Sequence, residues 1–372
     1  MKKLEPSEIR DAVAGFLNTR IPGASRLVVE LSDVAAKAGF SAETVMFEVH
    51  YVENDKPVTR QMVLRRQIFG HDLTFDADLS LQWKAMQAMK AHSSLPIPPL
   101  VGIDYGHDIL GGPFLIMERL PGQIVPQNPN YHVSGWLADL PVERRQEVFR
   151  NGIEMVARIH QTDWREGFEF LDMKERGPKG LPQYLSWIEE WLHWALKGRP
   201  HPVAEAAMAF LKEKAPNDAP INVLWGDAIP ANLLFDENNE VTGVIDWEFA
   251  ALAPGEIDLG WWMYFDELFS SGFGIPRLEG LPDRATMISI YENALGRKVQ
   301  NFEYYELIAG LRMTIVSIRA VDRVVAFGRL PVENDAWLNN PSSAWVARRL
   351  GREAVVVGPD FKSFTQALFG KH

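Results

Sequence analysis

Two acids and one amide lie close together in this sequence, at spacings that suit phosphoryl transfer. Asp227 follows an apolar run that predicts a buried strand, and Asn232 comes five residues later. Two short apolar runs, 233–235 and 241–245, then flank a polar turn and predict a hairpin. Asp246 ends the second strand of that hairpin, close to where Asn232 begins the first. The local pattern therefore gathers the three side chains at one end of a hairpin.

An acid, an amide and a second acid in this arrangement can transfer a phosphoryl group to a hydroxyl. One carboxylate accepts the proton of the attacking hydroxyl, while an amide and another carboxylate hold the magnesium ions that neutralise the transferred group. On this chemistry, Asp227 is the expected general base, and Asn232 and Asp246 are the expected Mg²⁺ ligands.

The same stretch resembles the aminoglycoside phosphotransferase and choline-kinase-like family, whose loop reads H-G-D-x-x-x-x-N, followed by I-D-W-E and a D-L pair. The matching positions here are Trp225-Gly226-Asp227, Asn232, Ile245–Glu248 and Asp258-Leu259. The resemblance implies an α+β, protein-kinase-like fold with two lobes, ATP and Mg²⁺ as cofactors, and a structural anchoring role for Asp258. Trp225 replaces the family histidine, and its indole N–H can donate a comparable hydrogen bond.

The smaller lobe that the resemblance implies matches the first part of the chain. Its strand patterns predict a five-stranded antiparallel sheet with one helix. A small-residue turn with Gly39 and Ser41 falls where the family lays backbone N–H groups over ATP phosphates. Arg65 takes the position of the phosphate-binding cation. Gln82 replaces that cation's acidic partner, so a neutral hydrogen bond is expected in place of an ion pair.

The boundary between the two expected domains falls near residue 120. Residues 1–120 would form the nucleotide-binding lobe, and residues 121–372 the helical lobe that carries catalysis and acceptor binding. Met117–Gly122 resembles the linker between the lobes, whose backbone faces the adenine in the family. Glu118 is assigned to the nucleotide site because it lies in this linker.

A helix predicted over residues 181–196 places Trp187, Trp191 and Trp194 on one face. Such a stripe is typical of a core. This helix also resembles the segment that walls the acceptor site in the family, so the three tryptophans are candidate pocket residues.

The phosphate acceptor is expected to be a small hydroxylated molecule. Residues 343–372 carry five Arg or Lys against two acids, which disfavours a cationic aminoglycoside. The motif spacing looks closer to kinase-like modules fused to some acyl-CoA dehydrogenases, which implies a hydroxylated acyl compound or a similar acid.

Composition excludes several other classes. With 372 residues, of which 47% are hydrophobic, the chain is long enough for two lobes that each have a core. The absence of cysteine excludes disulfides and thiolate chemistry. A net charge of −11 disfavours nucleic acid as a partner. No apolar run reaches membrane-spanning length and the amino terminus lacks a signal-peptide pattern, so a cytoplasmic protein without a membrane partner is expected.

The sequence is compatible with two functions. The first is an ATP- and Mg²⁺-dependent O-phosphotransferase, favoured because the proton-accepting and metal-holding residues are all present. The second is a catalytically weak or inactive nucleotide-binding module, favoured by the three departures Arg65, Gln82 and Trp225. A metal-dependent hydrolase using the same acids is disfavoured because the His pairs common in such sites are missing.

Overall fold

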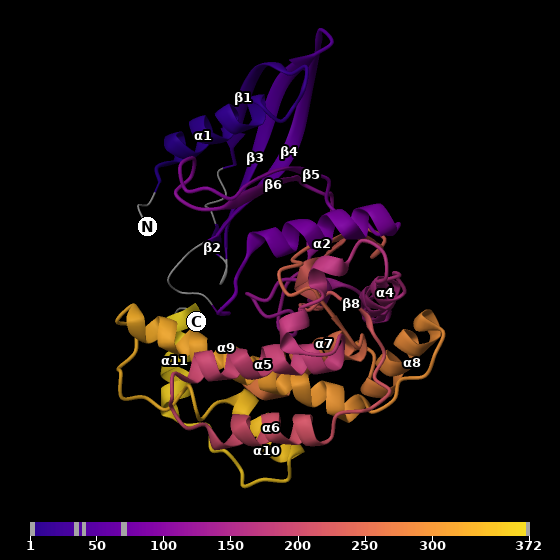
Figure 1. Cartoon of the computed structure of the whole chain (residues 1–372), viewed down its shortest axis with the longest axis vertical. Helices are drawn as coiled ribbons and strands as arrows, with labels where there is room; N and C mark the ends of the chain where they lie inside the picture. The colour runs from indigo at the N-terminus through magenta and orange to yellow at the C-terminus, as the bar shows by residue number, and fades with distance from the viewer. Residues whose placement is uncertain (1–3, 33–36, 39–41, 68–72, 370–372) are drawn as a thin grey trace.

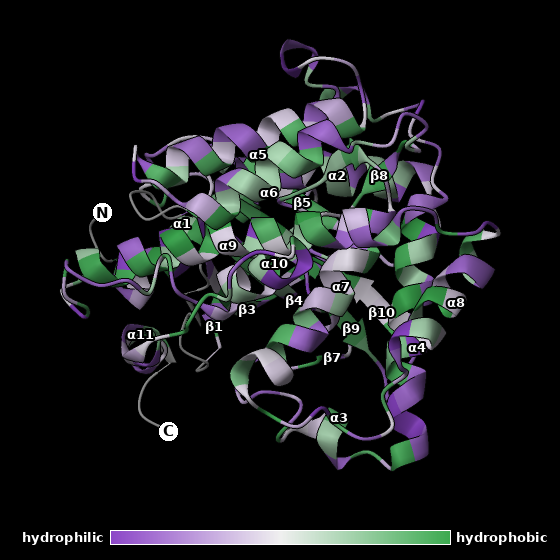
Figure 2. Cartoon of the chain, turned by 90° about the horizontal axis from the view of Figure 1, so that it is seen from below, coloured by the Kyte–Doolittle hydropathy of each residue, from purple (hydrophilic) through white to green (hydrophobic). Residues whose placement is uncertain are grey.

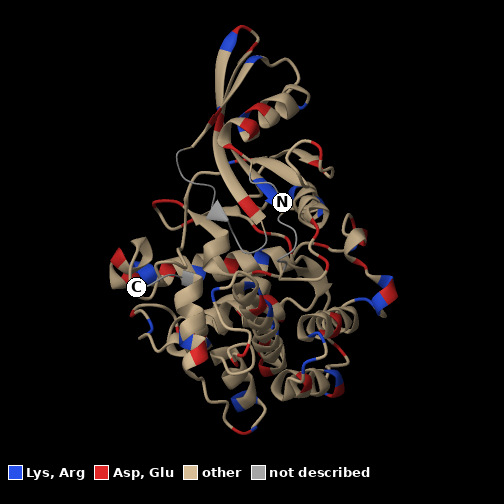
Figure 3. Cartoon of the chain, turned by 90° about the vertical axis from the view of Figure 1, so that its left-hand side faces the viewer, with Lys and Arg blue, Asp and Glu red and all other residues tan. Residues whose placement is uncertain are grey.

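The computed structural model describes residues 4–32, 37–38, 42–67 and 73–369. Figure 1 shows a sheet-rich N-terminal part above a larger helical part. Among the described residues, no helix is both long and apolar enough to cross a membrane. Basic and acidic residues are interspersed along the chain in both parts (Figure 3).

The N-terminal sheet is antiparallel, and its main path has five strands, as the sequence predicts. In spatial order these are β1 (Ser25–Leu31), β3 (Ala42–Glu53), β4 (Lys56–Gln67), β6 (Phe114–Glu118) and β5 (Leu100–Asp104). A two-residue strand, β2 (Lys37–Ala38), pairs in addition with β3. The amphipathic helix α1 (Pro6–Asn18) packs its apolar side, including Val13 and Leu17, into one core with the sheet.

Helix α2 (Leu79–His92) lies between the sheet and the helices below it (Figure 1). The Asp78 side chain caps its first turn by accepting a hydrogen bond from the Ser80 N–H at 2.7 Å. Its buried residues Met86 and Met89 share a core with Phe149 and other side chains of the helical part. This shared core fixes the sheet, and with it Arg65 on β4, relative to the catalytic loop.

The helical part is organised around the long helix α9 (Phe302–Ala326), which packs against α5, α6, α7 and α10 (Figure 2). Its helices are α3 (Trp136–Asp139), α4 (Val142–His160), α5 (Leu181–Leu196), α6 (Pro202–Glu213), α7 (Glu256–Phe269), α8 (Arg284–Leu295), α10 (Pro341–Arg349) and α11 (Pro359–Phe369). Four short 3₁₀ turns complete it: η1 (Glu169–Leu171), η2 (Lys174–Arg176), η3 (Pro230–Asn232) and η4 (Ser271–Phe273).

Two small sheets flank the loop that carries Asp227 and Asn232. One pairs β8 (Asn222–Leu224) with β11 (Ala251–Ala253), and the other has the order β10 (Val241–Val244), β9 (Leu233–Phe235), β7 (Gln123–Ile124). The predicted hairpin is therefore confirmed as β9 and β10. The Asp236 carboxylate closes its turn, because it accepts the N–H groups of Asn238 and Glu240, each at 2.9 Å.

Candidate active site

The loop after β8 brings Asp227 and Asn232 into direct contact. The turn η3 ends at Asn232, whose Nδ2 donates to Asp227 Oδ2 at 2.7 Å and to the Asp227 carbonyl at 3.0 Å. Since the amide nitrogen is used in these two bonds, Asn232 Oδ1 is the atom left to meet a cation.

Asp246 follows β10 in the left-handed backbone region, with φ at +61°. The Trp225 indole Nε1–H donates to the carbonyls of Ile245 at 3.0 Å and Asp246 at 3.1 Å. The Ile245 N–H in turn donates to the Asn232 carbonyl at 3.1 Å. Trp225, which replaces the family histidine, thus holds the backbone at Ile245 and Asp246, and the Ile245 N–H links this segment to Asn232.

Arg65 reaches this loop from the sheet. Its Nη1 lies 2.9 Å from Asp246 Oδ1, and its Nη2 lies 3.7 Å from Glu248 Oε2. Burial alone would lower the pKa of Arg65, but the carboxylates of Asp246 and Glu248 outweigh burial and shift that pKa upward. The structure therefore brings the proposed phosphate-binding cation and one proposed metal ligand together.

The Asp227 carboxylate is held by donors on both oxygens. The Trp261 indole N–H donates to Asp227 Oδ1 at 2.8 Å, opposite the Asn232 bond to Oδ2. Burial raises the pKa of Asp227 to about 6, and the nearby charge of Asp246 acts in the same direction. Ionised Asp227 still predominates near neutral pH, so this side chain can accept a proton there.

Asp258, in the first turn of α7, holds the loop by accepting two of its backbone N–H groups. Its Oδ2 accepts the Trp225 N–H at 2.8 Å, and its Oδ1 accepts the Gly226 N–H at 2.9 Å. His160 Nε2 lies 3.0 Å from Asp258 Oδ2, and the opposite ring nitrogen bonds the hydroxyl of Tyr291 at 2.7 Å. Asp258 and the His160 side chain are fully buried. The histidine therefore orients Asp258 and does not reach Asp227.

Glycine is required at position 226. Its φ is +88°, and a Cβ there would lie 2.1 Å from the Phe249 carbonyl oxygen. Any other residue would push Asp227 out of place.

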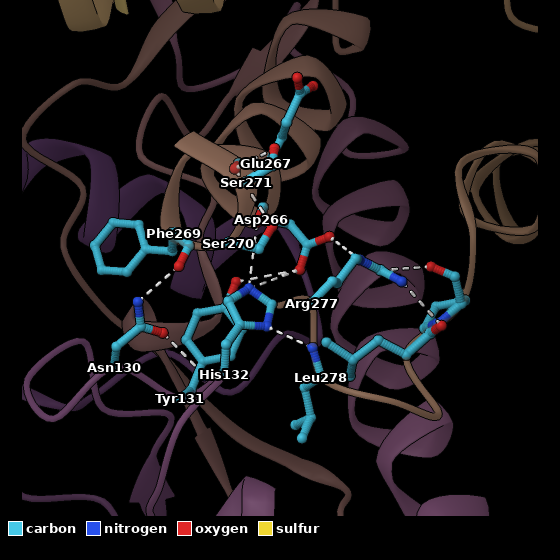
Figure 4. Close-up of polar contacts among 12 residues, drawn as sticks. Asn130, Tyr131, His132, Asp266, Glu267, Phe269, Ser270, Ser271, Arg277 and Leu278 are labelled. Carbon is cyan, nitrogen blue, oxygen red and sulfur yellow. Dashed lines mark hydrogen bonds and ion pairs between the residues drawn. The ribbon is translucent and has the colours of Figure 1, made fainter. Parts of the chain in front are cut away.

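A second polar network, around Asp266, holds the C-terminal end of α7 (Figure 4). Arg277 Nε donates to Asp266 Oδ2 at 2.6 Å, while His132 Nε2 bonds the Asp266 carbonyl at 3.2 Å. The Leu278 N–H donates to His132 Nδ1 at 3.1 Å. Because both ends of α7 are anchored, Asp258 and Trp261 are held on a fixed element.

The tryptophan stripe on α5 packs against the segment before α2. Trp191 is fully buried and donates its indole N–H to the Leu73 carbonyl at 2.7 Å. Trp187 is 8% exposed and donates to Asp76 Oδ2 at 2.8 Å. Trp194 lies under the guanidinium of Arg319, 4.1 Å from its ring centroid. All three rings contact α9 or this segment, as expected of a core stripe, and their assignment to the acceptor pocket stays a prediction.

The expected hydrogen bond between Gln82 and Arg65 is absent. Gln82 is fully buried, and within the described part of the chain neither its side-chain oxygen nor its nitrogen has a hydrogen-bond partner. The reason is that the Arg65 guanidinium is turned toward Asp246 and Glu248. Gln82 does not orient Arg65 in this structure.

Replacing Gln82 with Leu is expected to raise the free energy of unfolding by about 1–3 kcal/mol, the usual cost of a buried polar group without a partner. Chemical denaturation of the ligand-free variant measures it. A loss of stability would show that Gln82 has a partner in solution.

Three other residues are assigned to the nucleotide site. Glu118 is about one-third exposed and forms an ion pair with Arg60 at 3.3 Å. Gly39 and Ser41 lie outside the described residues. The roles of all three in nucleotide binding stay predictions.

The structure adds functional candidates that the sequence analysis does not assign, namely Glu248, Trp261 and Arg312. Trp261 follows Asp258 at helical i, i+3 spacing, which places the two on one face of α7 and is a signal that could have found it. Arg312 and Glu306 are two charged residues among the buried positions of α9, and a charge at such a position marks an unusual buried residue.

The oxygens at this centre fit a hard divalent cation. Mg²⁺ is usually held by one or two protein oxygens together with substrate phosphates and water. Asn232 Oδ1 and the Asp246 carboxylate meet that description. Among the described residues, no group of three or more His, Cys, Asp or Glu side chains could hold a metal. A site that shares its cation with a nucleotide is therefore the arrangement these donors suit.

The chain belongs to the phosphotransferase enzyme family, because the family model matches residues 39–287. Acyl-CoA dehydrogenase family member 10 of Mus musculus is 27% identical over 206 residues, which are 54% of this chain and 18% of the relative. A probable acyl-CoA dehydrogenase of Arabidopsis thaliana is 24% identical over 271 residues, 66% of this chain and 31% of the relative. The matches thus span less than a third of these two longer proteins.

Solved structures share the fold over nearly the whole chain. A putative aminoglycoside phosphotransferase from Ralstonia eutropha has a TM-score of 0.62 at 19% identity, covering 97% of this chain and 99% of that one. An aminoglycoside phosphotransferase in a ternary complex with ADP and hygromycin B has a TM-score of 0.52 at 17% identity, covering 91% and 97%. These similarities confirm the α+β, protein-kinase-like fold.

Proposed function

We propose that the protein is an ATP- and Mg²⁺-dependent O-phosphotransferase that acts on a hydroxyl of a small molecule. The observation that carries the proposal is the contact of Asp227 with Asn232 at 2.7 Å, beside Asp246 and its partner Arg65. Family membership and the related solved structures support small-molecule phosphotransfer as the reaction class.

Each residue of the centre has one role in this proposal. Asp227 orients the acceptor hydroxyl and takes its proton. Asn232 and Asp246 would hold Mg²⁺, which when bound neutralises charge on the transferred group. Arg65 would bind phosphate oxygens through its planar fork, with residues 1–120 as the nucleotide-binding lobe.

For the acceptor, we propose a hydroxylated acid, such as a hydroxylated acyl compound, ahead of a cationic aminoglycoside. The support is the sequence similarity to two proteins named as acyl-CoA dehydrogenases and the excess of basic residues over acids in residues 343–372.

A panel of hydroxylated compounds, assayed for ADP release from ATP with Mg²⁺, tests this function. Hydroxy acids, hydroxyacyl compounds, sugars and an aminoglycoside form its arms, and a reaction without acceptor gives the background. The proposal expects acceptor-dependent ADP release with at least one arm and no release without Mg²⁺. Stimulation by the aminoglycoside alone would overturn the acceptor class, and no stimulation in any arm would count against the enzyme.

A catalytically weak nucleotide-binding module is the second candidate. One observation favours it: Arg65 is engaged by Asp246 and Glu248, while Gln82 has no partner. Calorimetric titration with ATP in the presence of Mg²⁺ separates the two, since a module binds ATP without acceptor-dependent turnover.

A further inference from the structure

Gly226, the residue before the proposed base, is held through its N–H and its carbonyl by two groups of opposite charge. The Gly226 N–H donates to Asp258 Oδ1 at 2.9 Å, and the Gly226 carbonyl accepts a hydrogen bond from Arg312 Nη2 at 2.7 Å. Asp258 lies on α7 and Arg312 on α9, and these helices pack together. Because Asp227 follows Gly226 directly, the orientation of the Gly226–Asp227 peptide sets the direction of the Asp227 side chain.

Arg312 reaches Asp227 by a second route as well. Its guanidinium carbon lies 4.2 Å from the ring centroid of Trp261 and 5.5 Å from that of Phe249. The Trp261 indole donates to Asp227 Oδ1 at 2.8 Å. A guanidinium stacked on this ring therefore fixes the donor that aims the carboxylate.

Arg312 is costly to bury, which calls for a reason beyond packing. It is 1% exposed, and its Nε and Nη1 atoms find no hydrogen-bond partner among the described residues. Among the residues that the structure describes, it forms no ion pair with a carboxylate, whereas the exposed end of Arg284 pairs with Glu306 and Arg199 pairs with Asp322. A buried charge without a paired carboxylate is costly unless other contacts offset the cost, so Arg312 depends on its contacts with the Gly226 carbonyl and the rings of Trp261 and Phe249.

We propose that Arg312 is a positioning residue for phosphoryl transfer. It holds the Gly226 carbonyl and the Trp261 ring, and through them keeps the Asp227 carboxylate directed at the acceptor hydroxyl. This inference rests on the proposed function of Asp227. Arg312 itself touches neither acceptor nor nucleotide.

Two substitutions and a matched control test the role through kinetics. Arg312→Met removes the charge and the donor but keeps an unbranched side chain, whereas Arg312→Lys keeps a charge and a donor. The methionine variant is expected to lower kcat about 10–100-fold, the effect of a small misplacement of a reacting group. The dissociation constant for ATP with Mg²⁺ should stay nearly unchanged, and the lysine variant should recover part of kcat.

The control is Arg319→Met, because Arg319 lies on the same helix and also stacks on a tryptophan, Trp194. It is expected to leave kcat near that of the parent. An unchanged kcat in Arg312→Met, an equal loss in the control, or a loss confined to nucleotide affinity would each overturn the proposal. If the methionine variant does not fold, Arg312→Lys tests the role alone: it is expected to lower kcat in part and to leave ATP affinity unchanged, and either a full kcat or a loss confined to nucleotide affinity would overturn the proposal.

A readout that needs no turnover separates this inference from the proposed function. The indole ¹H–¹⁵N signal of Trp261, assigned with Trp261→Phe, reports its bond to Asp227. Arg312→Met is expected to shift this signal and speed its exchange with solvent, whereas Arg319→Met should not. If the parent shows no phosphotransfer but Arg312→Met still shifts the Trp261 signal, the proposed function is refuted and the link from Arg312 to Trp261 stands. An unmoved signal would refute the link itself.

Discussion

Replacing Asp227 with Asn is expected to lower kcat by about 10²–10⁴-fold, the usual loss when a positioned general base is removed. The amide keeps the shape and an oxygen for the Trp261 donor, but it cannot take a proton. Asn232 keeps its second bond, to the main-chain carbonyl of residue 227 at 3.0 Å. Burial already disfavours the ionised form of Asp227, since its pKa is raised to about 6, so the neutral amide should not destabilise the fold. Steady-state kinetics and thermal unfolding measure the two effects.

Asp236→Asn is the matched control for this substitution. Asp236 lies at the turn of the same hairpin, and its Oδ1 accepts two backbone N–H groups that an Asn oxygen can also accept. Its kcat is expected to equal that of the parent. Full activity in Asp227→Asn would remove Asp227 from the role of base, and an equal loss in both variants would indicate a general effect on the hairpin.

Replacing Asp246 with Ala is expected to abolish the Mg²⁺ dependence of ATP binding. A hard cation needs oxygen ligands, and of the two proposed Mg²⁺ ligands only Asn232 would remain. The substitution also removes the 2.9 Å ion pair of Arg65, which leaves that buried guanidinium with Glu248 at 3.7 Å. Calorimetric titrations with ATP, with and without Mg²⁺, measure the dependence.

Glu237→Ala serves as the control, because Glu237 is an exposed acid on the turn of the same hairpin. It is expected to bind ATP as the parent does under both conditions. An Asp246→Ala variant that retained the parent's response to Mg²⁺ would place the metal elsewhere.

Local patterns in the sequence predict most of the elements that carry the site. The apolar spacing predicts a helix over residues 181–196, and α5 has these bounds because it has one continuous buried face. The hairpin that unites Asn232 and Asp246 is equally local. By contrast, α6 is not predicted, because alanines supply two of its four buried positions and make a weak periodic signal.

Contacts between distant segments could not be predicted in the same way. The partner of Arg65 is one such case: kinase-like spacing suggests Gln82 on the next helix, whereas the structure pairs Arg65 with Asp246 and Glu248. Charge decides the outcome, since a carboxylate binds a buried guanidinium more strongly than a neutral amide does. The stacking of Arg312 on Trp261 likewise depends on how α9 crosses α7, which no local pattern contains.

Phosphorus-31 NMR of ATP, Mg²⁺ and the best acceptor of the panel, incubated with the parent chain, tests the central claim most directly. The account predicts that the γ-phosphate signal of ATP declines while a phosphomonoester signal appears, and that Asp227→Asn shows neither change on the same timescale. Formation of inorganic phosphate alone would identify a hydrolase, and an unchanged ATP spectrum would contradict phosphotransfer by this site.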